Sequence, residues 1–432
     1  MVVFLLVLVV VLALLGGVHW YVWRRLVRDV TAPGGLPRRI GTAAVVVLPL
    51  LSLGALVSAR AGVPFPVQQV IAWPGQMWLA VLLYLVLALV VGEAVRPLLR
   101  ARLARRAPAA AAAPAPAPVV PEAVPVPAAA TEPLTEPAPA APDAATATPV
   151  GPETPSDVSR RLFVSRVVGG TAAAVALGTV GYGTYGVLRG PRVKRVTVPL
   201  AKIPRAAHGY RIAVVSDIHL GPILGRAHTQ RIVDAINSTQ PDLIAVVGDL
   251  VDGTVENLGP AAEPLARLRA RHGSFFVTGN HEYFSGADAW VDHVRELGLR
   301  PLRNERLEIP AGFDLAGVDD VAGESEGQGP DFVRALGDRD RARAAVLLAH
   351  QPIVVHDAVR HGVDLQLSGH THGGQLWPGN LLAELANPTV AGLERYGDTQ
   401  LYVSRGAGAW GPPVRVGAPS DITVVELASK QA

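Results

Sequence analysis

The chain has 432 residues, enough for two or three structural units, and half of them are hydrophobic, which points to membrane segments. It contains no cysteine, which excludes disulfides and thiolate metal sites and leaves His, Asp, Glu, Asn or backbone oxygen as metal ligands. Residues 1–200 hold 18 Lys and Arg against 8 Asp and Glu, whereas residues 201–432 hold 21 against 28, so no nucleic-acid partner is expected for the acidic C-terminal half.

Three apolar runs open the chain, each of a length that suits a membrane-spanning helix. The runs cover about 2–23, 41–59 and 77–95. Arginines follow the first and the third run, whereas the segment 60–76 carries only Arg60. Because positive charge accumulates on the cytoplasmic side, loops 24–40 and 96–106 are expected inside, and the N-terminus and segment 60–76 outside. Residues 1–106 are therefore expected to form a transmembrane region, a better fit than buried helices of a globular core.

Between residues 107 and 158 the composition narrows to Ala, Pro, Thr and a few Glu. Such a stretch buries too little apolar surface to fold, and its prolines favour extended conformers. A disordered, semi-stiff linker is expected here, with a docking segment for a partner protein as the alternative.

Residues 159–190 can be interpreted either as an export signal or as a fourth membrane span. Arg160 and Arg161 precede an apolar, Gly- and Ala-rich stretch over 167–188, which is typical of a twin-arginine export signal. The same residues also fit an ordinary fourth span with a basic cytoplasmic flank. Both interpretations place the two arginines inside and everything after about residue 190 outside, and the first adds the twin-arginine export machinery as a partner. The sequence therefore predicts a multi-pass protein of the cell membrane with an extracytoplasmic C-terminal domain.

Residues 193–428 are expected to form one layered α/β domain. Apolar, β-branched runs of strand length alternate with segments of helical period. The expected strands are 212–216, 243–247, 275–278, 345–349, 365–368, 401–404 and 422–427, and the expected helices include 226–238, 287–297 and 353–360. Alternation of buried strands with helices is typical of a layered α/β fold.

Polar residues follow one expected strand after another in this domain. In chain order they are Asp217 and His219, Asp249 and Asp252, Asn280 with His281 and Glu282, His350, and His370 with His372. The carboxyl ends of strands in an open α/β sheet assemble ligand sites, so these five strand ends are expected to converge on one crevice. Carboxylate, imidazole and amide oxygen together favour Mn, Fe, Zn or Mg. Each motif alone is weak, but the five in this order favour a site with divalent metals over a structural role.

This series resembles the calcineurin-like metallophosphoesterase superfamily, whose pattern is D-x-H, G-D-x-x-D, G-N-H-[DE], H and G-H-x-H. Every element is present, and the resemblance spans about residues 199–428. The GHTHGGQ stretch at 369–375 and the segment from Ser404 to Arg415 are similar to a bacterial membrane-associated branch with relatives that act on phospholipids or nucleotide-linked lipids. The resemblance implies an α/β sandwich of two β-sheets flanked by helices, preceded by about four transmembrane helices.

The resemblance also implies a role for each motif residue. Two divalent ions would be held, one by Asp217, His219 and His372 and the other by Asn280, His350 and His370, with Asp249 bridging them. The ions would activate a bridging hydroxide for in-line attack on phosphorus. His281 would act as general acid or stabilise charge at the leaving group, Glu282 would orient it, and Asp252 would support a ligand histidine. Gly253 stands where Ser/Thr protein phosphatases have an arginine, which disfavours phosphoprotein substrates.

The expected activity is hydrolysis of a lipid-linked or membrane-proximal phosphoester, because the tether confines the site near the bilayer. The alternatives are an anchored phosphodiesterase or nucleotidase for soluble substrates, and a non-catalytic metal-binding sensory module. Trp377 and Trp410, beside Gly- and Pro-rich loops, are candidates for a substrate groove, and Arg405 is a candidate phosphate contact. Trp290 is expected in the core, and Arg415 is either a phosphate contact or a solvated surface residue.

Overall fold

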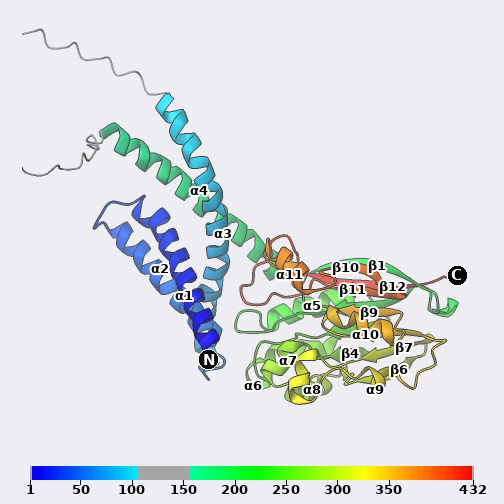
Figure 1. The fold of residues 1–432 in the computed structure, drawn as a ribbon. Coiled ribbons are helices and arrows are strands. Elements are labelled where there is room, and N and C mark those ends of the chain that lie inside the picture. The colour runs from blue at the N-terminus through cyan, green and yellow to red at the C-terminus, as the bar shows by residue number, and fades with distance from the viewer. Residues whose placement is uncertain (1, 106–154, 431–432) are drawn as a thin grey trace, which may run out of the picture.

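The computed structural model describes residues 2–105 and 155–430 (Figure 1). Within these ranges, a group of long helices leads into an α/β domain that begins after residue 190. The expected linker over 107–158 lies outside the described residues as far as residue 154, and its last residues already belong to a helix.

In the described part of the chain, four helices before the domain are long and apolar enough to cross a membrane. They are α1 (Val2–Trp23), continued by the π-helical turn η1 (Arg24–Arg28), α2 (Leu36–Val57), α3 (Phe65–Arg105) and α4 (Pro155–Leu188). Helix α1 occupies the first expected span. Helix α2 begins at Leu36 rather than at residue 41, because Pro37 suits the first helical turn, where its missing N–H has no partner to lose.

Helix α3 is longer than the expected third span at both ends. It begins at Phe65, so most of the segment 60–76, expected as a loop, is helical. Close packing against α2 stabilises this part of the helix. The Ser52 hydroxyl donates to the Gly75 carbonyl at 2.6 Å, and a Cβ at Gly75 would lie only 2.4 Å from the Leu51 carbonyl oxygen.

The arginine-rich ends of the helices lie together. Arg25 pairs with Glu93 of α3 across 2.8 Å, and Arg166 of α4 donates to the Val30 carbonyl at 3.2 Å. The α/β domain continues from the other end of α4 (Figure 1). The arginine-rich start of α4 and the α/β domain therefore lie at opposite ends of this helix.

The domain contains two mixed sheets, each with six strands among the described residues. The first has the order β1-β12-β2-β3-β4-β5 and the second the order β10-β11-β9-β8-β7-β6. The strands are β1 (Arg192–Leu200), β2 (Tyr210–Val215), β3 (Leu243–Val247), β4 (Ser274–Val277), β5 (Arg300–Pro301), β6 (Glu305–Ile309), β7 (Phe313–Gly317), β8 (Ala344–Leu348), β9 (Leu365–Ser368), β10 (Gly392–Tyr396), β11 (Thr399–Val403) and β12 (Asp421–Ser429). Strands β2, β3 and β4 are parallel, as are β8 and β9, so neighbouring carboxyl ends share an edge.

Helices cover the outer face of each sheet, and apolar side chains fill the space between the sheets. Val214 and Val346, from opposite sheets, share the central core, and Trp290 is buried under the first sheet, as expected. The domain helices are α5 (Arg226–Ser238), α6 (Val255–Ala262), α7 (Asn280–Ser285), α8 (Ala287–Glu296), α9 (Phe332–Leu336), α10 (Val355–Arg360) and α11 (Gly379–Ala386), with the 3₁₀ turns η2 (Arg205–Ala207), η3 (Glu263–Arg267), η4 (Val321–Glu326), η5 (Pro352–Val354) and η6 (His372–Gly374). This architecture confirms the expected sandwich of two sheets flanked by helices.

The domain packs against the helical group through two of its loops. Val414 and Leu376 belong to the same apolar cluster as Leu85 of α3. The Tyr84 hydroxyl of α3 donates to the Trp377 carbonyl at 3.0 Å. These contacts place the loop that follows β9 directly beside a candidate membrane span.

Candidate metal centre

The expected site residues lie where strands of both sheets end. They are Asp217 and His219 after β2, Asp249 after β3, Asn280 after β4, His350 after β8, and His370 and His372 after β9. Strands β2 to β4 belong to the first sheet, and β8 and β9 belong to the second. The site therefore lies at a common edge of the sandwich, where the carboxyl ends of parallel strands leave room for ligands.

One group of donor atoms comprises Asp217, His219 and His372, whose ligand atoms all lie within 4.8 Å of one another. The Nε2 atoms of His219 and His372 are 3.0 Å apart, and His372 Nε2 lies 3.5 Å from Asp217 Oδ1. Asp217 is fully buried, and its carboxylate accepts the backbone N–H of His370 at 3.0 Å. Two imidazoles and a carboxylate around one small space form a donor set suited to a divalent cation.

A second group comprises Asp249, His350 and His370, again with ligand atoms within 4.8 Å of one another. Asp249 Oδ2 lies 3.1 Å from His350 Nε2 and 3.7 Å from His219 Nε2, so one carboxylate oxygen faces both groups. The Asn280 side-chain oxygen lies 3.0 Å from His370 Nδ1 and extends the second group. The structure thus brings all seven expected ligands into two adjoining groups with Asp249 between them.

The hydrogen bonds around the centre leave ligand atoms free for cations. His350 Nδ1 lies 2.9 Å from the Val247 carbonyl, which can only accept, so Nδ1 carries a proton and Nε2 is the ring atom that faces Asp249. That buried Nε2 makes no hydrogen bond in the described part of the chain. Burial, together with the positive charges of His219 and Arg415, lowers the pKa of His372 well below its usual range and favours the neutral ring that binds metals.

The backbone at this edge adopts conformations that are rare for residues with side chains. Among the described residues, eight non-glycine residues have positive φ, and five of them are expected ligands. These are Asp217, His219, Asp249, His370 and His372, with φ between 49° and 73°. Such backbone strain is typical of functional sites. A Cβ at Gly279 would lie 2.3 Å from Asp249 Oδ1, so only glycine allows the loop to approach this closely.

Asp252 connects His219 with His281. Its Oδ1 lies 2.9 Å from His219 Nδ1 and 2.7 Å from His281 Nδ1. Burial alone would raise the pKa of Asp252, but the charges and hydrogen bonds of the two histidines lower it to about 2. Burial would likewise lower the pKa of His219, but the Asp252 carboxylate raises it to about 9. Asp252 therefore orients both rings, in the way that carboxylates beside metal-binding histidines commonly do.

Glu282 differs from the role that the resemblance implies. Its buried carboxylate accepts the backbone N–H groups of Gly279 at 2.6 Å, Leu250 at 2.8 Å and Asp249 at 3.0 Å. Burial, together with the charge of Asp249, raises the pKa of Glu282 to about 7. Glu282 therefore braces the loop that carries Asp249, and the carboxylate that orients His281 is that of Asp252 instead.

Two exposed aromatic side chains flank His281. The ring centroids of Phe284 and Trp410 lie 5.5 and 5.7 Å from that of His281, and the two residues are 66% and 56% exposed. Gln375 holds the Trp410 backbone through hydrogen bonds of 2.8 and 2.9 Å. Trp410 thus lies beside the expected catalytic histidine. The position of Phe284 beside His281 was not predicted from the sequence. The one indication of it is that an aromatic residue occurs shortly after the Gly-Asn-His-Glu motif.

A cavity of about 300 Å³ adjoins the centre on another side. Its lining includes Gly373, the neighbour of His372, together with Trp377 and Arg405. Trp377 is 54% exposed at the rim of this cavity. The structure therefore separates the expected substrate contacts, because Trp377 and Arg405 line this cavity whereas Trp410 flanks His281.

Arg415 is buried, which excludes the solvated alternative. Its guanidinium donates to the carbonyls of Gly408 at 2.7 Å, His372 at 3.0 Å and Ala418 at 3.2 Å, and lies 3.1 Å from His372 Nδ1. Burial lowers the pKa of Arg415 to about 10, so the group stays charged at neutral pH. Arg415 therefore braces the loop of a candidate ligand, a role for which the sequence carries no signal.

Comparison with known proteins agrees with this geometry. The family model for calcineurin-like phosphoesterases matches residues 210–374. A transmembrane protein with metallophosphoesterase domain from Danio rerio is 39% identical over 58% of this chain and 60% of its own length. Uncharacterized metallophosphoesterases from Helicobacter pylori and Aquifex aeolicus are 37% and 35% identical, over 59% and 55% of this chain and 69% and 92% of their own lengths. The chain thus spans 57–60% of the length of the vertebrate relatives it matches.

Proposed function

This chain belongs to the calcineurin-like metallophosphoesterase family, and on that premise we propose that it is a membrane-anchored hydrolase of phosphoesters. The observation that carries the proposal is the pair of adjoining donor groups that share Asp249. Imidazole, carboxylate and amide oxygen suit two divalent ions of the Mn, Fe, Zn or Mg type. When bound, such ions act as Lewis acids on phosphoryl oxygens and lower the pKa of an attacking water.

In this proposal the chain's own residues hold the ions in fixed positions. One ion would be held by Asp217, His219 and His372 and the other by Asn280, His350 and His370, with the Asp249 carboxylate between the two groups. The carbonyl of Val247 and the carboxylate of Asp252 fix the rings of His350 and His219 from behind. Because these rings are already oriented, little reorganisation is needed when metal or substrate binds.

His281 is the proposed proton donor to the leaving oxygen. Its Nδ1 lies 2.7 Å from Asp252 Oδ1, which orients the ring. A histidine held in this way can either transfer a proton to the leaving group or offset the negative charge that develops there. The exposed rings of Phe284 and Trp410 form apolar walls beside it.

The proposed substrate is lipid-linked or membrane-proximal, because an exposed apolar surface adjoins the centre. Helix α11 exposes Leu381, Leu382 and Leu385 at 55%, 72% and 85%. The helix begins two residues after Trp377, whose carbonyl is hydrogen-bonded to Tyr84 of α3. An apolar helix face beside a membrane span is suited to the bilayer interface. A phosphoester with its apolar part in the bilayer could reach the centre along the cavity that Trp377 lines.

The proposed location is the cell membrane, with the domain on the extracytoplasmic side. The support is the arginine-rich ends of the candidate spans, which lie away from the domain. A reporter fused after residue 430 should be active only outside the cytoplasm, and a cytoplasmic signal contradicts this orientation. Replacing Arg160 and Arg161 by Lys should block export if the twin-arginine machinery is used, and should leave it intact if α4 inserts as an ordinary span.

The activity is tested with the full chain purified in detergent and supplied with Mn. We expect metal-dependent hydrolysis of bis-p-nitrophenyl phosphate that is lost in Asp249→Ala. Turnover equal to that of Asp249→Ala rejects the enzyme and favours a sensory metal-binding role. A panel of phospholipids, UDP-linked lipids and nucleotides then tests substrate class. Faster turnover of the lipids supports the proposal, and faster turnover of nucleotides indicates an anchored nucleotidase.

A further inference from the structure

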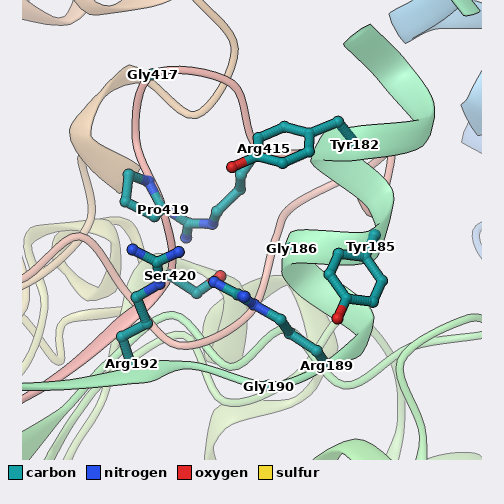
Figure 2. A pocket seen from close by; sticks show the side chains of 10 residues that line it. All are labelled: Tyr182, Tyr185, Gly186, Arg189, Gly190, Arg192, Arg415, Gly417, Pro419 and Ser420. Carbon is teal, nitrogen blue, oxygen red and sulfur yellow. The ribbon is translucent and has the colours of Figure 1, made fainter. Parts of the chain in front are cut away.

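A separate cavity lies between the end of α4 and the domain. Its volume is about 230 Å³, and the last turns of α4, the start of β1 and the loop before β12 line it. Figure 2 shows Arg189, Arg192 and Arg415 around the cavity, with Ser420 among them. No carboxylate is among its lining residues in the part of the chain that the structure describes. Three guanidinium groups therefore line the cavity, and the aspartates that act on Arg415, Asp217 and Asp421, are not among its lining residues.

Ser420 adds an independent indication of a ligand. The residue is 4% exposed, and within the described ranges its hydroxyl makes no hydrogen bond. Buried hydroxyl groups normally have a partner. The adjacent carboxylate of Asp421 is paired with Lys194, and the Arg192 N–H donates to the Ser420 carbonyl at 3.0 Å, which holds the loop against β1. A buried hydroxyl without a partner, in a wall with three guanidinium groups and no carboxylate, indicates a site for an anion.

The position of the cavity indicates which anion. The apolar span of α4 ends at Leu188, and Arg189 follows it directly. Tyr182 and Tyr185, in the last turns of α4, are 74% and 62% exposed, and the Arg189 guanidinium lies 5.7 Å from the centroid of the Tyr185 ring. Exposed tyrosines and an arginine at the end of a span are typical of the level of lipid headgroups.

We propose that this cavity binds the phosphate of an anionic lipid headgroup and fixes the domain on the membrane surface. Arg189 and Arg192 provide charge-assisted hydrogen bonds, and the Ser420 hydroxyl donates a further one. Arg415 forms the inner wall and also contacts His372, so the bound headgroup lies against the loop of the metal centre. The lipid is retained here and not cleaved, which separates this site from the proposed hydrolase.

The experiment uses the full chain in detergent with EDTA, so that hydrolysis plays no part. Binding of dioleoylphosphatidylglycerol and of dioleoylphosphatidylcholine is measured by native mass spectrometry. The variant is Arg189→Gln/Arg192→Gln, and the control is Arg195→Gln/Arg205→Gln, which removes the same charge from exposed residues outside the cavity. We expect phosphatidylglycerol to bind the cavity variant at least about tenfold more weakly than the wild type or the control.

Two further measurements decide what occupies the cavity. Ser420→Ala, a change too small to disturb folding, should also weaken phosphatidylglycerol binding, and thermal unfolding midpoints check that each variant is folded. In another outcome, the wild type and the control bind inorganic phosphate but no lipid, while the cavity variant binds neither. That result supports an anion site in the cavity and identifies its ligand as a free anion. Equal binding of phosphatidylglycerol by the cavity variant and the control overturns the proposal. It is also overturned if the wild type binds phosphatidylglycerol no better than phosphatidylcholine and does not bind inorganic phosphate. None of these outcomes bears on the hydrolase, because no metal is present.

Discussion

The metal centre buries charged side chains, whereas helix α11 exposes apolar ones. Both are unusual in a folded protein, where charged residues are mostly exposed and apolar ones mostly buried. The centre buries Asp217 and Asp249 at 0% and 2% exposure, whereas α11 leaves Leu382 and Leu385 at 72% and 85%. Carboxylates are rarely buried without a partner, and clustered leucines are rarely left in water. Each arrangement therefore points to a partner, divalent cations for the centre and a bilayer for the helix. Under the proposed function, the centre would provide the chemistry and α11 would determine which substrates reach it.

Loss of Asp249 should have the largest effect on activity, and it should act through the metal centre alone and not through α11. Its Oδ2 faces both donor groups, so Asp249→Ala should lower kcat by about 1000-fold for soluble and lipid substrates alike. The measurement is steady-state kinetics on bis-p-nitrophenyl phosphate and on the preferred lipid. Asp398→Ala, at a fully exposed carboxylate, is the matched control and should have no effect. A loss confined to lipid substrates would contradict the division of roles.

Loss of His281 should affect the chemical step and leave the metals in place. We expect His281→Ala to lower kcat by about 100-fold, because a proton donor is removed while the seven expected ligands remain. Metal content by mass spectrometry should equal that of the wild type. His356→Ala, at an exposed histidine, serves as control. Loss of metal in His281→Ala would show that this histidine supports the centre and does not act in the reaction.

Asp252→Asn should produce an intermediate effect. The substitution keeps the shape of the side chain but removes the charge that orients His219 and His281. An outer carboxylate of this kind commonly contributes between about tenfold and 100-fold, so we expect about tenfold weaker metal binding with a similar loss of activity. Titration with Mn measures the metal affinity. Unchanged affinity together with reduced kcat would confine the role of Asp252 to His281.

Substitutions on α11 should have the smallest effect on activity, and that effect should be confined to lipid substrates. Leu382→Asp/Leu385→Asp should raise KM for a lipid-linked substrate by about fivefold, because the charged face no longer suits the bilayer interface. Hydrolysis of bis-p-nitrophenyl phosphate should not change. Val333→Asp/Ile353→Asp, at exposed apolar residues elsewhere in the domain, is the control. Equal loss on both substrates would place α11 in the structure of the centre and not in substrate access.

The strands that carry the centre could be predicted from the sequence because they are buried on both faces. Strands β3 (Leu243–Val247) and β9 (Leu365–Ser368) occur at the residues expected from their continuous apolar runs. Strand β10 (Gly392–Tyr396) was missed because it lies at the edge of its sheet and is mostly exposed, so charged residues interrupt its apolar pattern. The start of α3 was also not predicted. Its first turns are stabilised by packing against α2, and a contact between two separate helices cannot be read from the local sequence pattern.

The candidate ligands could be chosen from motif order, but their supporting contacts could not. Asp252 faces both His219 and His281 because three separate loops meet, and sequence spacing carries no information about such a meeting. Glu282 turns toward the backbone of the Asp249 loop for the same reason. Arg415 is a single arginine in a Gly- and Pro-rich segment, where a buried brace and a solvated surface residue look alike.

The metal content of the full chain tests the central claim most directly. The protein is purified without chelator, loaded with Mn and desalted, and metal is counted per chain by mass spectrometry alongside Asp249→Ala and Asp398→Ala. The two donor groups predict close to two ions per chain in the wild type and in Asp398→Ala, and fewer in Asp249→Ala, with hydrolysis rising as the second ion binds. One ion or none in an active wild-type protein would contradict a shared two-metal centre at Asp249.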